Sequence, residues 1–187
     1  SQAMSDELIE ACRYRFESPY VRLKKSFVAF SASCFPPGRP MLEGAQALMQ
    51  KIFGEFTFDA TATQVATPLV EVLENRRGVC QHFAHLMLAC LRSRGLAARY
   101  VSGYLLTQPP PGQPRMIGAD ASHAWVSVFC PVLGWVDFDP TNNVQPGLEH
   151  ITLAWGRDFS DVSPLRGVIL GGGGHDPEVR VTVLPMA

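Results

Sequence analysis

Apolar residues in the first half of the chain follow a helical period. They recur three or four positions apart over 41–53 and again over 80–91, which predicts two helices with one buried face each. The second helix begins at Cys80, and its apolar face consists of Phe83, Ala84, Met87, Leu88 and Leu91. Gly95, with arginines just before it, is a typical helix stop. A shorter helix is predicted to begin at Pro68, because proline fits the first helical position.

Beyond Gly95, apolar and polar residues alternate, as they do in strands with one buried face. This alternation predicts strands at Ala97–Leu106, Ser122–Cys130, Trp135–Asp139, Ile151–Trp155, Val168–Leu170 and Val179–Leu184. Helices followed by strands are typical of an α+β fold with an antiparallel sheet. We expect the helix that begins at Cys80 to pack on that sheet.

The 187 residues are enough for one domain with a hydrophobic core, and no repeat or break in composition divides them. We therefore expect residues 4–187 to form a single domain. Ser1, Gln2 and Ala3 precede Met4 in the manner of residues added to an excised segment. The chain is accordingly expected to be part of a longer protein.

Charge and composition argue against several kinds of partner. The net charge of -1 offers no basic surface for nucleic acid or an acidic membrane. No apolar run approaches the roughly 18 residues of a transmembrane helix, and no signal peptide is recognisable. The cysteines are odd in number and widely spaced, which favours free thiols in a reducing compartment. We therefore expect a cytoplasmic protein.

Cys80 is the first candidate for chemistry. It lies at the predicted start of a helix, where unpaired backbone N–H groups and the helix dipole favour a thiolate. A thiolate in that position is a candidate nucleophile. A small buried residue on the core face is an equally good interpretation of the helix alone, because free cysteines are often buried.

His123 and Asp139 are the candidate partners of Cys80. They lie on two predicted strands joined by a short connection, so the histidine and the carboxylate can form a hydrogen bond between strands. Together the three residues supply a nucleophile, a base that takes its proton and an acid that orients the imidazole. The backbone N–H of Cys80 is a natural donor to an oxyanion.

The length of the strand connection tests this pairing. A four-residue loop at 131–134 would put Asp139 on the opposite face of the sheet from His123. A loop of three or five residues, or a bulge, gives the two side chains a shared face and makes them diagonal neighbours. We therefore predict that the connection has three or five residues, or contains a bulge.

His82 and His85 offer a rival site. They lie three positions apart on the helix that begins at Cys80, and together they could ligate a metal. No carboxylate or thiol obviously converges on them, so an ordinary polar helix face is the favoured interpretation. We expect no metal and no cofactor.

Four motifs resemble the bacterial transglutaminase-like family, which belongs to the papain-like cysteine-enzyme superfamily. In chain order they are Gly78-x-Cys80, the run from Leu91 to Tyr104, His123-Ala124-Trp125-Val126 and Gly134-Trp135-Val136-x-Phe138-Asp139-Pro140-Thr141. The matching core covers about residues 65–145. The resemblance implies a papain-like core and a triad of Cys80, His123 and Asp139. Members often carry glutamate where this chain has Ser127, so we expect the polarity of the pocket to differ.

The resemblance implies thiol-dependent acyl transfer at an amide bond through a thioester, in a cysteine protease, an amidase or a transglutaminase. The expected substrate is a peptide or protein amide, with water or a primary amine as acceptor. Hydrolysis is favoured over crosslinking, because no residue specifies an amine site. One alternative is a binding module that keeps the fold without activity, and a weaker one is a metal enzyme that uses His82 and His85. No pattern in the chain predicts an oligomeric state.

Overall fold

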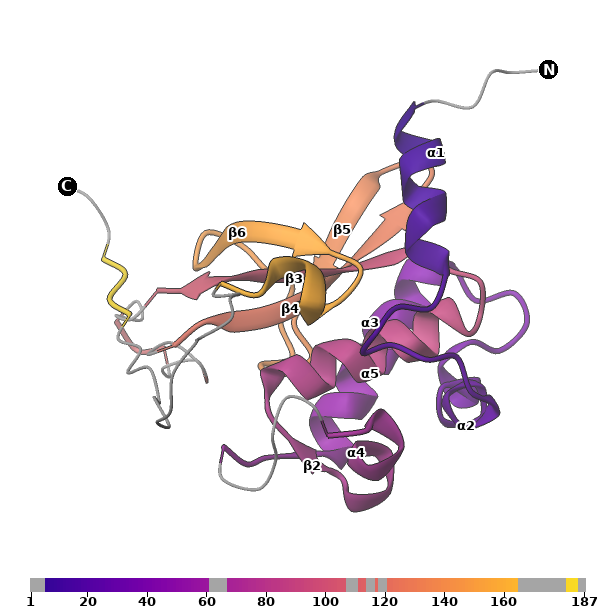
Figure 1. The fold of residues 1–187 in the computed structure, drawn as a ribbon, viewed down its shortest axis with the longest axis horizontal. Helices are drawn as coiled ribbons and strands as arrows, with labels where there is room; N and C mark the ends of the chain where they lie inside the picture. The colour runs from indigo at the N-terminus through magenta and orange to yellow at the C-terminus, as the bar shows by residue number, and fades with distance from the viewer. Residues whose placement is uncertain are drawn as a thin grey trace, which may run out of the picture.

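The computed structural model describes residues 6–60, 67–106, 111–113, 117, 121–164 and 181–184. A four-stranded sheet forms one layer, and most of the helices pack on one side of it (Figure 1). The helices are α1 (Asp6–Cys12), α2 (Lys25–Phe30), α3 (Met41–Glu55), α4 (Leu69–Asn75), α5 (Cys80–Arg92) and α6 (Phe159–Val162), with 3-10 turns η1 (Arg13–Arg15) and η2 (Ala32–Cys34). The strands are β1 (Thr57–Phe58), β2 (Arg77–Gly78), β3 (Ala98–Leu105), β4 (His123–Cys130), β5 (Gly134–Phe138) and β6 (His150–Gly156). The predicted α+β fold with an antiparallel sheet is confirmed.

Helix α5 lies at the centre of the domain. It contacts strands β3 and β4 on one side and helices α2, α3 and α4 on the others (Figure 1). Every residue from His82 to Arg92 is buried, including those outside the predicted apolar face. The helix ends as predicted: Gly95 has φ +77°, its N–H donates to the Arg92 carbonyl at 2.8 Å, and the next N–H reaches the Leu91 carbonyl at 3.1 Å.

The main sheet has the strand order β5-β4-β3-β6, and all its pairs are antiparallel. Cys130 pairs with Gly134, so the connection between β4 and β5 has three residues. Gly134 has φ +73°, a conformation that glycine adopts without strain. This register confirms the prediction of a connection that places Asp139 and His123 on a shared face.

Strand β6 forms one edge of the sheet and pairs with β3 through an irregular register. The ladder shifts between Ser102 and Gly103, which marks a β-bulge. At Gly103 a Cβ atom would collide with the Ile151 backbone and with the ring of Trp125. The absence of a side chain at Gly103 therefore lets β6 and Trp125 approach β3 closely.

Two expectations for individual elements need correction. Pro68 precedes α4 as its N-cap, one position before the helix begins, because its ψ of 133° is not helical. The strand expected at Val179–Leu184 does not form over 181–184, which have no regular structure, and its first two residues lie outside the described ranges. The expected strand Val168–Leu170 also lies outside them. Among the described segments, no helix has the length and apolar character needed to cross a bilayer.

Substitution of Gly103 tests the close approach of β6 and Trp125. We expect Gly103→Ala to lower the free energy of unfolding by about 1–3 kcal/mol, because the new methyl group overpacks this contact. Gly54→Ala is the matched control, since a Cβ at this exposed position in α3 meets no atom within 4 Å and alanine favours helix. Urea unfolding of both variants makes the comparison, and equal stabilities for the two would contradict the assignment.

Candidate active site

The start of α5 holds Cys80 at a fixed place. Val79 is the N-cap residue, and its backbone N–H donates to Nδ1 of His82 at 3.2 Å. The side chain of the third helical residue thus caps the start of the helix. A Cβ at Gly78 would lie 2.9 Å from the Cβ of His82, so the chain passes close to the helix here. Cys80 is therefore the first residue of the helix, as the sequence predicts.

The Cys80 side chain is nearly buried, with 5% of the residue exposed. Its Sγ donates to Oε1 of Gln81 at 3.3 Å. His123 is close enough that Cys80 contributes to its protonation, but Nδ1 of His123 has no partner in full hydrogen-bond geometry.

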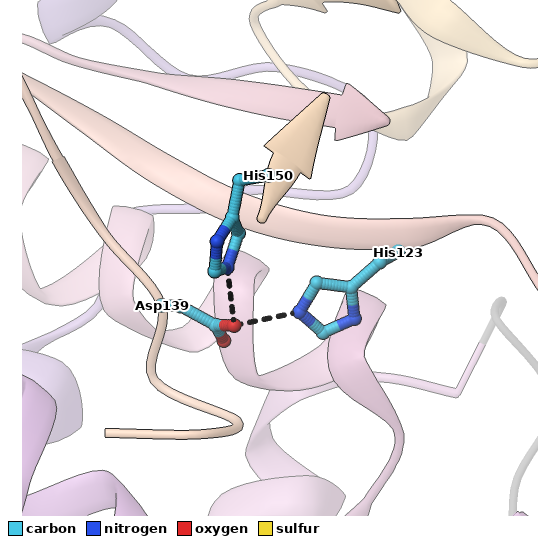
Figure 2. Close-up of side chains that lie close together, drawn as sticks. All are labelled: His123, Asp139 and His150. Atoms are coloured by element: carbon cyan, nitrogen blue, oxygen red, sulfur yellow. Dashed lines mark hydrogen bonds and ion pairs between the residues drawn. The ribbon is translucent and has the colours of Figure 1, made fainter. Parts of the chain in front are cut away.

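His123 and Asp139 form the central contact of the site. Nε2 of His123 donates to Oδ2 of Asp139 at 2.8 Å, and both side chains are fully buried (Figure 2). The hydrogen bond expected between the two strands is therefore present. Because a carboxylate only accepts, the proton lies on Nε2, and Nδ1 remains as the ring nitrogen available to sulfur.

Asp139 accepts hydrogen bonds from four residues in all. Besides His123, Oδ2 accepts from Nδ2 of Asn142 at 2.8 Å and from Nε2 of His150 at 3.1 Å. Oδ1 accepts from the backbone N–H groups of Thr141 at 2.9 Å and Asn142 at 3.3 Å. The chain turns at Pro140 so that the residues after the strand fold back onto the carboxylate.

These contacts change the protonation of both members of the pair. Burial alone would lower the pKa of His123, but the hydrogen bond to Asp139 and the nearby Cys80 side chain outweigh burial and raise the pKa to about 10. Burial would raise the pKa of Asp139, but the hydrogen bonds from His123 and His150 overcome it and lower that pKa. An imidazolium facing a carboxylate is therefore the favoured state of the pair.

His150 and Asn142 are site residues that the sequence did not reveal. His150 begins strand β6, whereas the predicted strand begins one residue later, and the segment 140–149 before it has no periodic pattern. Its one signal is that it opens a strand, as His123 does. Asn142 follows Asp139 by three residues, a spacing at which a side chain in a turn can reach back.

His123, Asp139 and His150 are also the only group of three potential metal ligands within the described ranges, with ligand atoms within 4.8 Å of one another. Bound histidines normally donate their second ring nitrogen to a carboxylate or carbonyl. Here Nδ1 of both His123 and His150 is buried without a partner. Hydrogen bonding to Asp139 accounts for the cluster, and the missing outer contacts do not fit a metal.

The expectation of a polar helix face at His82 and His85 is wrong. Both side chains are buried, because α5 is covered on all sides. Nδ1 of His82 accepts from the helix start, and Nε2 of His85 accepts from the Phe159 backbone N–H at 3.1 Å. Burial lowers the pKa of His85 to about 3, so its ring is neutral and stacks on Tyr20. Each histidine therefore accepts a hydrogen bond from a backbone N–H and has a structural role.

Ser127 lies on strand β4, four residues after His123 and on the same face. It is fully buried in the sheet between Arg99 on β3 and Asp137 on β5, and its hydroxyl has no partner among the described residues. Ser127 therefore occupies a buried position of the sheet, and the expected difference in pocket polarity stays a prediction.

Comparison with known proteins identifies the family. A model of the transglutaminase-like superfamily matches residues 29–140, and the chain belongs to that superfamily. An uncharacterized protein of Mycobacterium tuberculosis is 46% identical over 161 residues, which cover 83% of this chain and 51% of the relative. The chain thus spans about half the length of the mycobacterial relatives it matches. A protein-glutamine gamma-glutamyltransferase of Pseudomonas aeruginosa is 31% identical over 136 residues, or 65% of this chain and 20% of the relative.

Solved structures share the fold. A candidate cysteine protease from Cytophaga hutchinsonii superposes with a TM-score of 0.68 at 24% identity, over 86% of this chain and 50% of the other. The periplasmic domain of TgpA from Pseudomonas aeruginosa superposes with a TM-score of 0.56 at 24% identity, over 72% and 48% of the two chains. The family resemblance and the fold expected from it are confirmed.

Ring ¹⁵N NMR tests the charge on His123. The ring should remain doubly protonated from about pH 5 to about pH 8, because its pKa is raised above the ordinary value of 6.5. His85 should stay neutral over the same range. In Asp139→Asn, burial is no longer opposed by a carboxylate, so His123 should titrate below about pH 7. A wild-type midpoint near the ordinary value would contradict the pairing.

Proposed function

We propose that this protein catalyses thiol-dependent acyl transfer at an amide bond, with Cys80 as nucleophile, His123 as general base and acid, and Asp139 as the group that orients His123. The observation that carries the proposal is the buried hydrogen bond between Nε2 of His123 and Asp139. It leaves Nδ1 for the Cys80 sulfur at the start of α5. Nucleophile, base and orienting acid are the parts that such chemistry needs.

In the first half of the reaction, the proton of Cys80 already resides on Nδ1 of His123, so the two groups react as a thiolate and an imidazolium, and the thiolate attacks the amide carbonyl. A carbon–sulfur bond forms, and the carbonyl electron pair moves to oxygen. The backbone N–H of Cys80 lies at the helix start, where it can donate to that oxyanion. Collapse breaks the carbon–nitrogen bond, and the departing nitrogen takes the proton from His123.

In the second half, the thioester on Cys80 is attacked by water or by a primary amine. His123 takes a proton from the attacking group, and collapse of the tetrahedral species breaks the carbon–sulfur bond. The product is an acid when water attacks and a new amide when an amine attacks. Throughout, Asp139 holds the proton on Nε2 of His123 and balances the positive charge of the ring.

The Pseudomonas aeruginosa relative gives the first substrate class to test. Its name describes transfer from protein-bound glutamine, and it is 31% identical over 65% of this chain. We infer a peptide or protein amide as substrate, with water as the default acceptor and a primary amine as the competing one. Independence from metal and cofactor, and a cytoplasmic location, remain predictions.

Selective alkylation tests the nucleophile without a known substrate. At about pH 6, iodoacetamide should modify Cys80 roughly a hundredfold faster than Cys12 or Cys130, because only a thiolate reacts and an ordinary thiol is scarcely ionised there. His123→Gln should remove the advantage of Cys80, and the rate at Cys130 is the internal control. Peptide mass spectrometry measures each site separately. Slow, uniform labelling of all the cysteines would instead favour a binding module.

A glutamine-containing peptide, incubated with and without a primary amine, tests the reaction itself. We expect release of ammonia in water alone and incorporation of the amine when it is supplied, both absent in Cys80→Ala. Mass spectrometry of the peptide separates these products from a cleaved backbone, which would assign a protease. The absence of any Cys80-dependent product on glutamine or backbone amides would contradict acyl transfer.

A further inference from the structure

A second imidazole contacts the carboxylate of the candidate site. Nε2 of His150 lies 3.1 Å from Oδ2 of Asp139, the oxygen that also accepts from His123 at 2.8 Å (Figure 2). The His150 side chain is 2% exposed, so solvent scarcely reaches it. Two histidines from different strands therefore share one carboxylate oxygen inside the protein.

The hydrogen bond fixes the proton on His150. An ionised carboxylate only accepts, so Nε2 of His150 must carry the hydrogen. Its Nδ1 is buried and has no partner within the described residues. Among the described residues, the polar contact of the His150 ring is therefore the hydrogen bond from Nε2 to Asp139.

The orientation of the His150 ring is fixed by Trp125. The two rings meet edge to face, with centroids 5.1 Å apart and planes at 86°. Trp125 is itself held by a hydrogen bond from Nε1 to Oδ2 of Asp137 at 3.1 Å, and it packs where Gly103 has no side chain. The ring of His150 therefore has a defined place beside the carboxylate, independent of its own hydrogen bond.

We propose that His150 is a positioning residue for the His123–Asp139 pair, which uses part of the hydrogen-bonding capacity of Asp139 and so limits how firmly His123 holds its proton. The inference rests on the proposed acyl transfer, in which His123 must both take a proton and release it to the departing nitrogen. A carboxylate oxygen that accepts from more donors is a weaker base toward each one. His150 thereby keeps His123 able to act as an acid.

The direction of the effect follows from the titratable groups that face His123 in the described part of the chain. They are Cys80 from α5, Asp139 after β5 and His150 from β6. Cys80 and Asp139 raise the pKa of His123 against the effect of burial. Loss of the His150 donor leaves Asp139 a stronger acceptor, so the pKa of His123 should rise further.

Two variants separate the donor from the ring. His150→Phe keeps an aromatic ring against Trp125 but removes the N–H that reaches Asp139. His150→Gln removes the ring but carries an amide N–H at about the same distance from the backbone as Nε2. The inference requires the pKa of His123 to change in His150→Phe and to stay close to its wild-type value in His150→Gln. A purely structural role of the ring requires the reverse.

The readout is the pH dependence of Cys80 alkylation by iodoacetamide, followed by peptide mass spectrometry. The upper inflection of the rate reports loss of the proton from His123. In His150→Phe we expect this inflection to move up by about one pH unit, while His150→Gln stays close to the wild type. Equal inflections in the wild type and both variants would overturn the inference, as would a shift in the glutamine variant alone.

Failure of this inference is distinguishable from failure of the proposed function. Without His123-dependent alkylation of Cys80 in the wild type, the proposed function fails. If this alkylation is observed, the upper pH inflections of the wild type and the two His150 variants decide the role of His150. If a variant does not fold, ring ¹⁵N NMR of the wild type remains: it should show the His150 proton on Nε2, and a proton on Nδ1 instead would overturn the inference.

Discussion

A carboxylate out of contact with solvent is costly unless hydrogen bonds replace its hydration, and Asp139 is in that position. Its two oxygens accept from His123, Asn142, His150 and the backbone of Thr141. Removal of a partner from such a group leaves charge without compensation, at a cost of several kcal/mol. The donors and the carboxylate therefore hold each other in place, and the position of His123 relative to Cys80 depends on the set remaining complete.

The fold supplies these donors from separate elements. Strand β4 brings His123, the turn after β5 brings Asn142, and β6 brings His150. The register of β4 and β5 sets the distance between His123 and Asp139, and the bulge between β3 and β6 lets Trp125 and His150 meet. The positions of the site residues at the end of the sheet thus depend on the registers of the strand pairs β4–β5 and β3–β6.

Sequence patterns predicted the parts of this structure that depend on neighbours along the chain. The start of α5 at Cys80 and its end at Gly95 follow from local signals, and the register of β4 and β5 follows from the requirement that His123 and Asp139 share a face. An apolar stripe on a helix, however, indicates only one buried face. Helices cover α5 on its other sides, so His82 and His85 are buried where the pattern suggested an exposed surface.

The role of His150 lay beyond such patterns for a related reason. Its contact with Asp139 arises because β6 pairs with β3, and strand pairing between distant segments leaves no periodic mark in either one. The burial of Ser127 between Arg99 and Asp137 has the same origin. Pairing partners across a sheet are set by the whole topology, whereas periodicity reports one strand at a time.

The two edge strands of the sheet, β5 and β6, never touch along their ladders because β4 and β3 lie between them. Asp139, just after β5, nevertheless bonds His150, the first residue of β6. The carboxylate thus links the two edge strands at one end of the sheet. Separation of either edge strand there breaks this hydrogen bond and exposes a buried charge. We therefore expect this end of β5 and of β6 to unfold cooperatively.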